Sequence, residues 1–112
     1  MNDLLAAHCQ RYSKDTLPLD KAKSTALLND IPGWEISTDG NSISRSFQFK
    51  DYYQTIAFVN ATAWISHEED HHPELSVSYN QCAVVFSTHS IGGLSLNDFI
   101  CAAKFNAVLW QK

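Results

Sequence analysis

The chain has 112 residues, of which 45% are hydrophobic and 18% are charged, and this composition predicts one folded domain over residues 1–112 rather than a disordered segment. The net charge is -4 and the lysines and arginines are scattered, which argues against a nucleic-acid-binding surface and against binding to anionic membranes. No apolar run approaches the roughly 20 residues that span a bilayer.

The first half of the sequence predicts an arm, a helix and a hairpin. Residues 1–18 are mixed and polar, which indicates an arm with a short helical turn. Residues 19–30 favour a helix, and the Pro-Gly pair that follows stops it. Hydrophobic residues then alternate with polar ones over residues 34–49, around an Asp-Gly-Asn turn, and this stretch therefore predicts a β-hairpin.

The longest predicted helix covers residues 52–69. Asp51 is its expected N-cap, with a glutamine three residues later as capping partner. Pro73 ends the helical stretch, because the residue before a proline disfavours the helical region. The face expected to turn towards the core consists of Ile56, Val59 and Ala63 with the neighbouring row Phe58, Ala61 and Ile65.

The last part of the sequence predicts a second hairpin and a third helix. Residues 75–79 and 82–89 alternate as strands, and Ser95 with Asp98 caps a helix over residues 96–110. The order α-β-β-α-β-β-α predicts an α+β fold, in which a four-stranded antiparallel sheet has three helices packed on one face.

The cysteines are Cys9, Cys82 and Cys101, an odd number without a C-x-x-C pair. A disulfide framework is therefore not expected, and a reducing cytoplasm is the predicted location. The strand that begins at Cys82 is apolar on both faces, and sheet edges invite pairing, so we expect a homo-oligomer that uses a sheet edge or the last helix.

Four of the five histidines lie between residues 67 and 89. The letters HEEDH, from His67 to His71, match H-E-x-x-H, which in zinc hydrolases places two histidines on a metal and a glutamate as base. That geometry needs a helix that continues through His71, whereas Pro73 follows two residues later. A structural alternative is a group of solvated histidines that interact with the helix dipole.

Metal-free acid-base catalysis is a third interpretation. Imidazole has an unperturbed pKa of about 6.5, so two imidazoles on different sides of a substrate can both deliver and remove protons. His71 and His72 follow a helix end, and His89 ends a predicted strand. If the hairpin over residues 75–89 folds back, these histidines can form a cluster.

A longer pattern of spaced motifs is more specific than any of these. It comprises His71-His72-Pro73, Tyr79, His89 and Asp98, and outside them Pro32-Gly33-Trp34, Phe47-Gln48-Phe49-Lys50-Asp51, Ser87-Thr88-His89, Gly92-Gly93-Leu94-Ser95 and Asn97-Asp98. In this order and register the pattern resembles the pterin-4a-carbinolamine dehydratases over roughly residues 17–108.

The resemblance implies a four-stranded antiparallel sheet with three helices on one face. It implies dehydration of 4a-hydroxytetrahydropterin to quinonoid dihydropterin, which recycles the cofactor of an aromatic amino-acid hydroxylase. It also implies a homodimer or homotetramer that needs no metal or organic cofactor. By resemblance, His71 and His89 are the acid-base pair around the 4a-hydroxyl group, and His72 holds the pterin.

Further site residues follow from the same resemblance. The pterin-binding stretches fall on Asp70-His71-His72 and on Ser87-Thr88-His89-Ser90. Trp34 is a candidate wall for the pterin ring and has an equally good role as a core aromatic, while Asp98 is expected to cap a helix. The family pattern begins with an acidic residue where this chain has His67, and Glu68 is the nearest substitute. A non-catalytic pterin- or protein-binding module on the same fold is the alternative.

Overall fold

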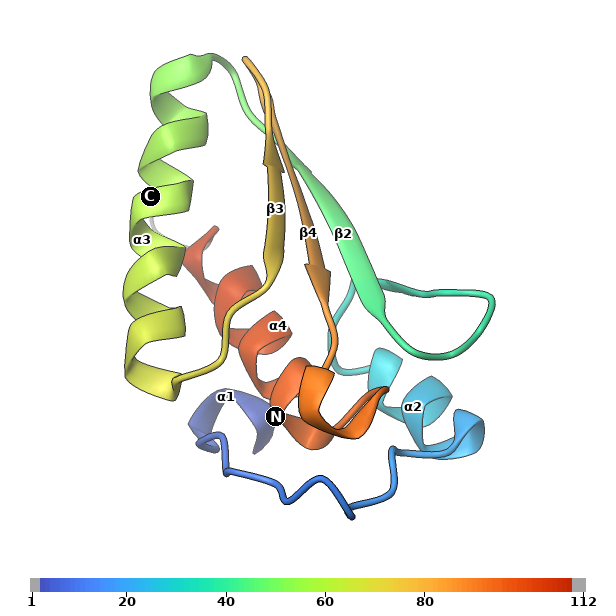
Figure 1. The fold of residues 1–112 in the computed structure, drawn as a ribbon. Helices are drawn as coiled ribbons and strands as arrows, with labels where there is room; N and C mark the ends of the chain where they lie inside the picture. Colours follow the sequence, from blue (N-terminus) through green and yellow to red (C-terminus); the bar gives the residue numbers. More distant parts are fainter. Residues whose placement is uncertain (1–2, 110–112) are drawn as a thin grey trace.

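The computed structural model describes residues 3–109, so the ends of the predicted domain and of the last predicted helix lie outside the described residues (Figure 1). Within residues 3–109, no helix is both long and apolar enough to cross a membrane. The elements, in chain order, are α1 (Asp3–Ala6), α2 (Lys21–Leu28), β1 (Glu35–Ile36), β2 (Ile43–Gln48), α3 (Tyr52–Glu69), β3 (Glu74–Val77), β4 (Gln81–Phe86), the 3-10 helix η1 (His89–Ile91) and α4 (Leu96–Val108).

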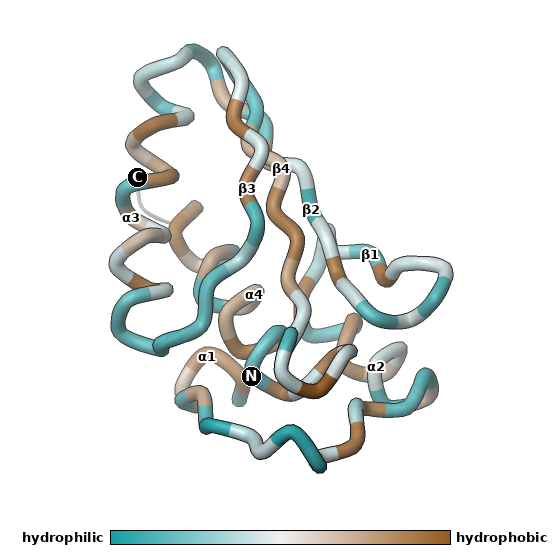
Figure 2. The backbone as a smooth tube through the Cα atoms, viewed as in Figure 1, coloured by the Kyte–Doolittle hydropathy of each residue, from teal (hydrophilic) through white to brown (hydrophobic). Residues whose placement is uncertain are grey.

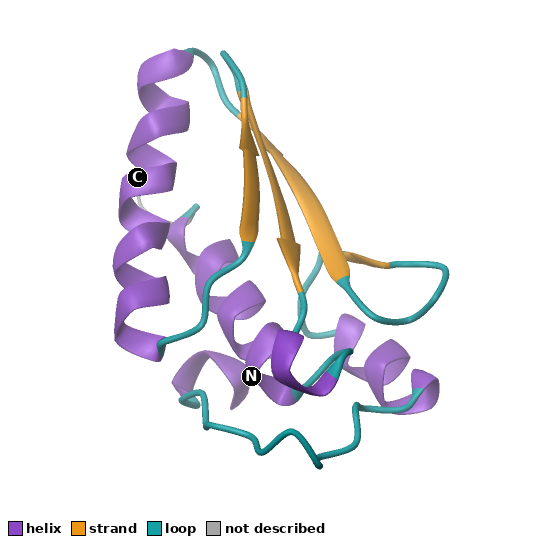
Figure 3. Cartoon of the chain, in the orientation of Figure 1, coloured by secondary structure: helices purple, strands orange, loops and turns teal. Residues whose placement is uncertain are grey.

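The four strands form one antiparallel sheet in the order β1-β2-β4-β3 (Figure 3). The two hairpins therefore meet in the middle of the sheet, where β2 pairs with β4 and Phe47 lies opposite Cys82. This architecture confirms the predicted α+β fold, and α1 is the helical turn expected in the N-terminal arm.

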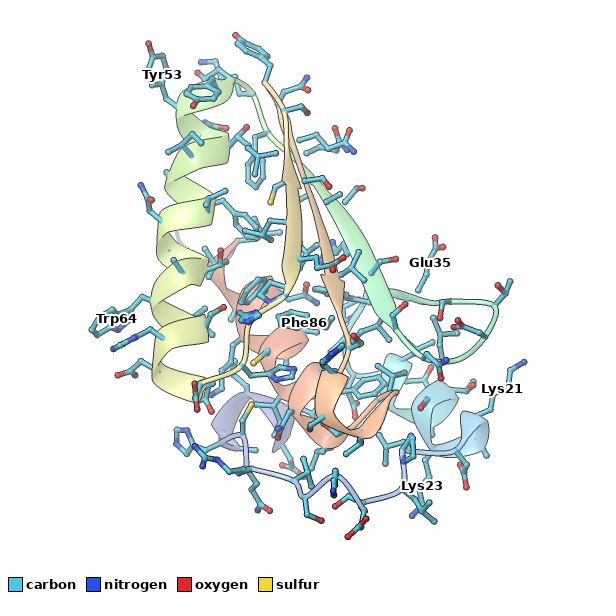
Figure 4. All side chains as sticks on the ribbon, in the orientation of Figure 1. Lys21, Lys23, Glu35, Tyr53, Trp64 and Phe86 are labelled. Carbon is cyan, nitrogen blue, oxygen red and sulfur yellow. The ribbon has the colours of Figure 1, made fainter. Side chains whose placement is uncertain are left out.

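The core lies between the sheet and the helices α3 and α4, and Figure 2 shows hydrophobic residues concentrated along β4 and α4. Phe47 of β2 packs on Phe58 of α3 with ring centroids 4.5 Å apart. Phe86 of β4 packs on Phe105 of α4 at 5.1 Å, and Figure 4 labels Phe86 in this interior position. Each such buried ring contributes about 1.5–3 kcal/mol to folding.

The buried face of α3 differs from the expected one. Phe58 is buried as predicted, but its companions are Thr55 and Thr62, and Ala61 and Ala63 are exposed. Each threonine hydroxyl donates to the carbonyl oxygen four residues earlier, at 2.8 Å for Thr55 and 2.9 Å for Thr62. Because these hydroxyls are satisfied within the helix, threonine can occupy positions that hydrophobic periodicity assigns to apolar residues.

Both predicted helix caps are present. Asp51 accepts a hydrogen bond from the backbone N–H of Gln54 at 2.9 Å. Ser95 and Asp98 form a complete capping box at the start of α4. These caps satisfy N–H groups that have no partner inside the helix, and typical caps are worth about 1 kcal/mol.

The second hairpin ends earlier than the sequence predicts. β4 ends at Phe86 rather than at His89. Thr88 makes one isolated bridge to Gly93, and His89 begins the 3-10 helix η1. Gly92, at φ 68°, adopts the left-handed conformation and ends η1.

β3 is an edge strand, and all four of its residues are exposed. Leu75 and Val77 expose 38% and 42% of their surface. An exposed edge with apolar side chains is a template for pairing with another strand. Assembly through a sheet edge stays a prediction.

Gly33 is the position where we expect a small substitution to be costly. It has φ +91°, and an added Cβ would lie 2.8 Å from the guanidinium of Arg45, which is hydrogen-bonded to Pro32 O and Asn106 Oδ1. Gly33→Ala should destabilise the fold by about 1–3 kcal/mol, measured by urea denaturation. Gly40→Ala is the matched control, because Gly40 has φ +76° and open space around it. Equal losses in both variants would contradict a role for the Arg45 contact.

Candidate active site

His71 lies against a buried carboxylate just after the end of α3. Asp70 ends the helix in the left-handed conformation, at φ 52°, and the chain then turns towards α4. The His71 ring stacks on Phe86 with centroids 5.7 Å apart and planes at 9°. Its Nε2 lies 2.6 Å from Oδ1 of Asp98, whose side chain is fully buried, while 12% of the His71 side chain is exposed.

The Asp98 carboxylate accepts hydrogen bonds from several neighbouring groups. Oδ2 receives the Thr88 hydroxyl at 2.8 Å and the backbone N–H of Ser95 at 3.0 Å. The Ser95 hydroxyl lies 2.6 Å from Thr88 Oγ1, so Ser95 can donate to Thr88 while Thr88 donates to Asp98. The two carboxylate oxygens of Asp98 can accept all of these hydrogen bonds together with one from His71. If His71 donates to this carboxylate, its Nε2 carries the proton and its Nδ1 does not.

His71 faces a pocket of about 550 Å³ between the ends of α3 and α4 and the N-terminal arm. Its lining residues are Cys9, Gln10, Arg11, Tyr12, Glu68, Glu69, Asp70, His71, Thr88, Ser90 and Asn97. The four residues from the arm were not among the predicted site residues. The arm carries no periodic pattern, and its partners Glu69 and Asn97 are 60 and 87 residues away in the sequence, so no local signal could place it.

The arm is held by side chains at the ends of two helices. Glu69 of α3 accepts the backbone N–H of Cys9 at 2.7 Å and lies 2.9 Å from His8 Nδ1. Asn97 of α4 makes a pair of hydrogen bonds with the backbone of Gln10, at 2.9 Å and 2.6 Å. These bonds fix the arm, which forms one wall of the pocket.

The Glu69 carboxylate is charged in the folded protein. Burial alone would raise its pKa, but the Cys9 N–H, the His8 ring and Lys104, whose Nζ lies 3.7 Å away, outweigh burial and lower the pKa. Since the folded pKa is below the unfolded one, the stabilisation is complete above the unfolded pKa and is lost as the pH falls through the folded pKa. We therefore expect acid to weaken the attachment of the arm.

Glu69→Gln should loosen the arm at neutral pH, because an amide keeps the shape but loses the charge-assisted bonds. We expect trypsin to cleave after Arg11 or Lys14 about tenfold faster than in the unaltered protein, since bonds to charged groups are worth about 1.5–3 kcal/mol. Glu68→Gln is the matched control, because Glu68 is exposed. Equal cleavage rates in the two variants would show that Glu69 does not anchor the arm.

Several predicted site residues meet at this pocket. Glu68, Asp70, Thr88 and Ser90 line it together with His71. The side chains of His71 and Thr88 both bind the carboxylate of Asp98. The hairpin therefore brings residue 88 close to residue 71. Asp98 therefore caps α4, as predicted, and also holds His71, a carboxylate role for which Glu68 was the expected substitute.

Other predicted residues lie outside this lining. His72, Ser87 and His89 are exposed, and His89 stands between Thr88 and Ser90, which do line the pocket. Trp34 lies in the core, 6% exposed, and its Nε1 donates to Asn106 Oδ1 at 2.8 Å. This position favours the structural role of Trp34 over the role of a pterin wall.

The HEEDH stretch does not have the geometry of a zinc hydrolase. α3 ends at Glu69, so His67 and His71 do not share a helical face. His67 is exposed and its ring lies 5.3 Å from that of Trp64, which points away from the core (Figure 4). His71 instead binds Asp98. Across residues 3–109, no three histidine, cysteine, aspartate or glutamate side chains are grouped so that they could hold a metal ion.

The family model described as pterin 4 alpha carbinolamine dehydratase matches residues 17–108 of the chain. The chain belongs to this family. A relative from Xylella fastidiosa (strain 9a5c), named "Putative pterin-4-alpha-carbinolamine dehydratase", is 53% identical over 99% of this chain and 98% of its own length. A relative of the same name from Stenotrophomonas maltophilia (strain K279a) is 55% identical over 96% of this chain and 93% of its own length.

A solved structure supports the same assignment. The transcriptional coactivator/pterin dehydratase from Brucella melitensis is 33% identical, with a TM-score of 0.78, and the match covers 81% of this chain and 97% of that one. The dehydratase family model begins at residue 17, so the arm residues Cys9–Tyr12 precede it. These pocket-lining residues therefore lie before the matched segment, whereas the Xylella relative aligns over 99% of the chain.

Proposed function

We propose that the chain performs the pterin-4a-carbinolamine dehydratase reaction of its family by metal-free acid-base catalysis, with His71 and His89 as the proton-transfer groups. The substrate is a 4a-hydroxytetrahydropterin, and the products are quinonoid dihydropterin and water. This reaction returns the cofactor of an aromatic amino-acid hydroxylase to a reducible form, which makes such a hydroxylase the functional partner.

The reaction needs two proton transfers. One imidazole delivers a proton to the 4a-hydroxyl group, the C4a–O bond breaks and water leaves. The other imidazole takes the proton from N5, whose electrons form the new double bond to C4a. Each positioned acid or base contributes about 10²–10⁴-fold to the rate. Two imidazole groups on different sides of the ring can therefore carry out both transfers without a metal.

The observation that carries the proposal is the contact between His71 and Asp98. A buried carboxylate 2.6 Å from Nε2 holds the imidazole in one orientation. Thr88 and Ser95 in turn hold Asp98. Such a chain of hydrogen bonds is more than a solvated surface histidine would need, and it supports a catalytic rather than an incidental role.

The remaining pocket groups fit a flat polar ring. We assign His72 and the stretches Asp70-His71-His72 and Ser87-Thr88-His89-Ser90 to pterin binding, with the exposed side chains closing on the substrate when it binds. The pocket offers about 550 Å³, which falls within the range of small-molecule sites.

A binding group that acts equally on substrate and transition state changes KM, so His72→Ala should raise KM more than it lowers kcat.

Turnover of freshly prepared 4a-hydroxytetrahydropterin tests the proposal. The expected result is formation of quinonoid dihydropterin, followed by its absorbance, well above the uncatalysed rate. If the protein binds the pterin without accelerating its dehydration, the non-catalytic binding module is the better assignment. The presence of His67 where the family pattern has an acidic residue is the feature that favours this alternative.

Removal of metal ions should leave the activity unchanged. Dialysis against EDTA and assay in chelated buffer should give the same kcat as the untreated protein, because one imidazole delivers the proton to the leaving hydroxyl and the other removes the proton from N5. A parallel metal analysis by plasma emission serves as the control for complete removal. Loss of activity on dialysis that zinc restores would contradict metal-free catalysis.

A further inference from the structure

Two thiols meet where the N-terminal arm crosses α4. Cys9 Sγ lies 3.6 Å from Cys101 Sγ, although the residues are 92 positions apart in the sequence. Both cysteines are free, as is Cys82, which is buried in β4. We propose that Cys9 and Cys101 are an oxidisable pair, which forms a reversible intramolecular disulfide in the presence of a small-molecule disulfide such as oxidised glutathione.

The geometry requires little movement. A disulfide bond is about 2.05 Å long, so the two sulfur atoms must approach each other by about 1.5 Å. Cys101 is fixed in α4 and fully buried. Cys9 belongs to an irregular segment that is attached through hydrogen bonds at its own N–H and at Gln10. The required shift can therefore come from the arm, without distortion of the helix.

The two thiols differ in access. Cys9 is partly exposed and lines the pocket, so a dissolved oxidant can reach it. The hydrogen bond with Cys9 and burial raise the pKa of Cys101, and the charges of Glu69 and Asp98 raise it further. Cys101 is therefore the protected partner, and Cys9 is the sulfur that meets the oxidant first.

The exchange is balanced in two steps. The Cys9 thiolate attacks one sulfur of the oxidant, the oxidant's S–S bond breaks, and its other half leaves as a thiolate that takes a proton. The Cys101 sulfur then attacks Cys9 in the mixed disulfide, which forms the Cys9–Cys101 bond and releases the second half of the oxidant with the Cys101 proton. Two protein thiols are oxidised, and one small disulfide is reduced to two thiols.

The bond would change the attachment of the pocket wall. In the reduced protein the arm is held by hydrogen bonds, of which the ones to Glu69 depend on its charge. Oxidation would add a covalent link to α4 that does not depend on this charge, and would remove the weak S–H contact of Cys101 with the carbonyl oxygen of His71, at 4.0 Å. In a reducing compartment such a bond persists only during oxidative conditions, as in redox-sensing proteins.

Intact-mass measurement tests the proposal without any assay of pterin turnover, so it stands apart from the proposed function. The native protein is incubated with oxidised glutathione, and the remaining thiols are then blocked with an alkylating agent in denaturant. The expected product is a monomer that has lost two hydrogen atoms and carries one alkyl group. Dithiothreitol should restore three alkylatable thiols.

Three single variants identify the pair. Cys82→Ser should still lose two hydrogen atoms, whereas Cys9→Ser and Cys101→Ser should not. In oxidised Cys82→Ser, trypsin cleavage after Arg11 should leave the arm peptide attached until reductant is added. Oxidation should also raise the melting temperature by about 5 °C or more, because the link closes a long loop. A stable glutathione adduct on Cys9, a disulfide-linked dimer or an unchanged mass would each overturn the proposal.

Discussion

His71→Ala should lower kcat by about 10²–10⁴-fold, which is the scale expected when one acid-base group is removed. The ring is held by Asp98 at one nitrogen and stacks on Phe86, so its orientation is fixed before a substrate arrives. A group used in the transition state affects kcat and kcat/KM together, and KM should change little. Steady-state kinetics with the hydroxylated pterin measure this effect.

His67→Ala provides the matched control for this experiment. His67 lies four residues earlier, is exposed and contacts Trp64 rather than the pocket. We expect its kcat to stay within about twofold of the unaltered protein, since surface substitutions away from structured contacts have small effects. A wild-type rate in His71→Ala, with the uncatalysed reaction subtracted, would remove His71 from the mechanism. His89→Ala, measured in the same way, tests the second proton-transfer group.

Asp98→Asn should reduce both stability and activity. Asp98 accepts from His71, Thr88 and the Ser95 N–H, and it has no exposed surface. An amide has one acceptor oxygen and an NH₂ group, so one of these donors would face another donor. We expect a loss of about 2–4 kcal/mol in the free energy of unfolding. We also expect kcat to fall at least about tenfold, because His71 loses its orienting charge.

Asp51→Asn separates the capping role from the orienting role. Asp51 caps α3 through the Gln54 N–H but has no histidine partner among its hydrogen bonds. Asparagine is as good an N-cap as aspartate, so this variant should keep its stability and kcat.

In the double variant His71→Ala/Asp98→Asn the loss in kcat should be smaller than the product of the single losses, since residues that act as a unit are not additive. Multiplicative losses would mean that Asp98 acts only on the fold.

The elements could be predicted because their signals are local. Asp51 and Ser95 cap helices by bonds to residues two or three positions away, and period-two alternation fixes the two hairpins. The order of strands in the sheet, with β2 beside β4, is a long-range property that these signals do not contain. The two hairpins predicted an antiparallel sheet, and the family resemblance implied the same sheet and the roles of His71, His72 and His89.

The parts that could not be predicted depend on distant partners. Burial of Thr55 and Thr62 runs against their polarity and is possible because each hydroxyl bonds within the helix. Trp34 could equally have faced a ligand, and only the position of Asn106, 72 residues later, decides where its N–H goes. The contact of Asp98 with His71 likewise joins residues 27 positions apart, and the local sequence pattern indicated only the capping role of Asp98.

The attachment of the arm to α4 has a consequence for the order of events during synthesis. Gln10 leaves the ribosome early, whereas its partner Asn97 is made 87 residues later. The attachment of the arm to α4 therefore cannot form while the sheet is being completed, because contacts of such large sequence separation have to wait for the last helix. A nascent chain that already contains both hairpins still lacks the pocket, so pterin binding should appear only after α4 has been made and folded, as the final step of maturation.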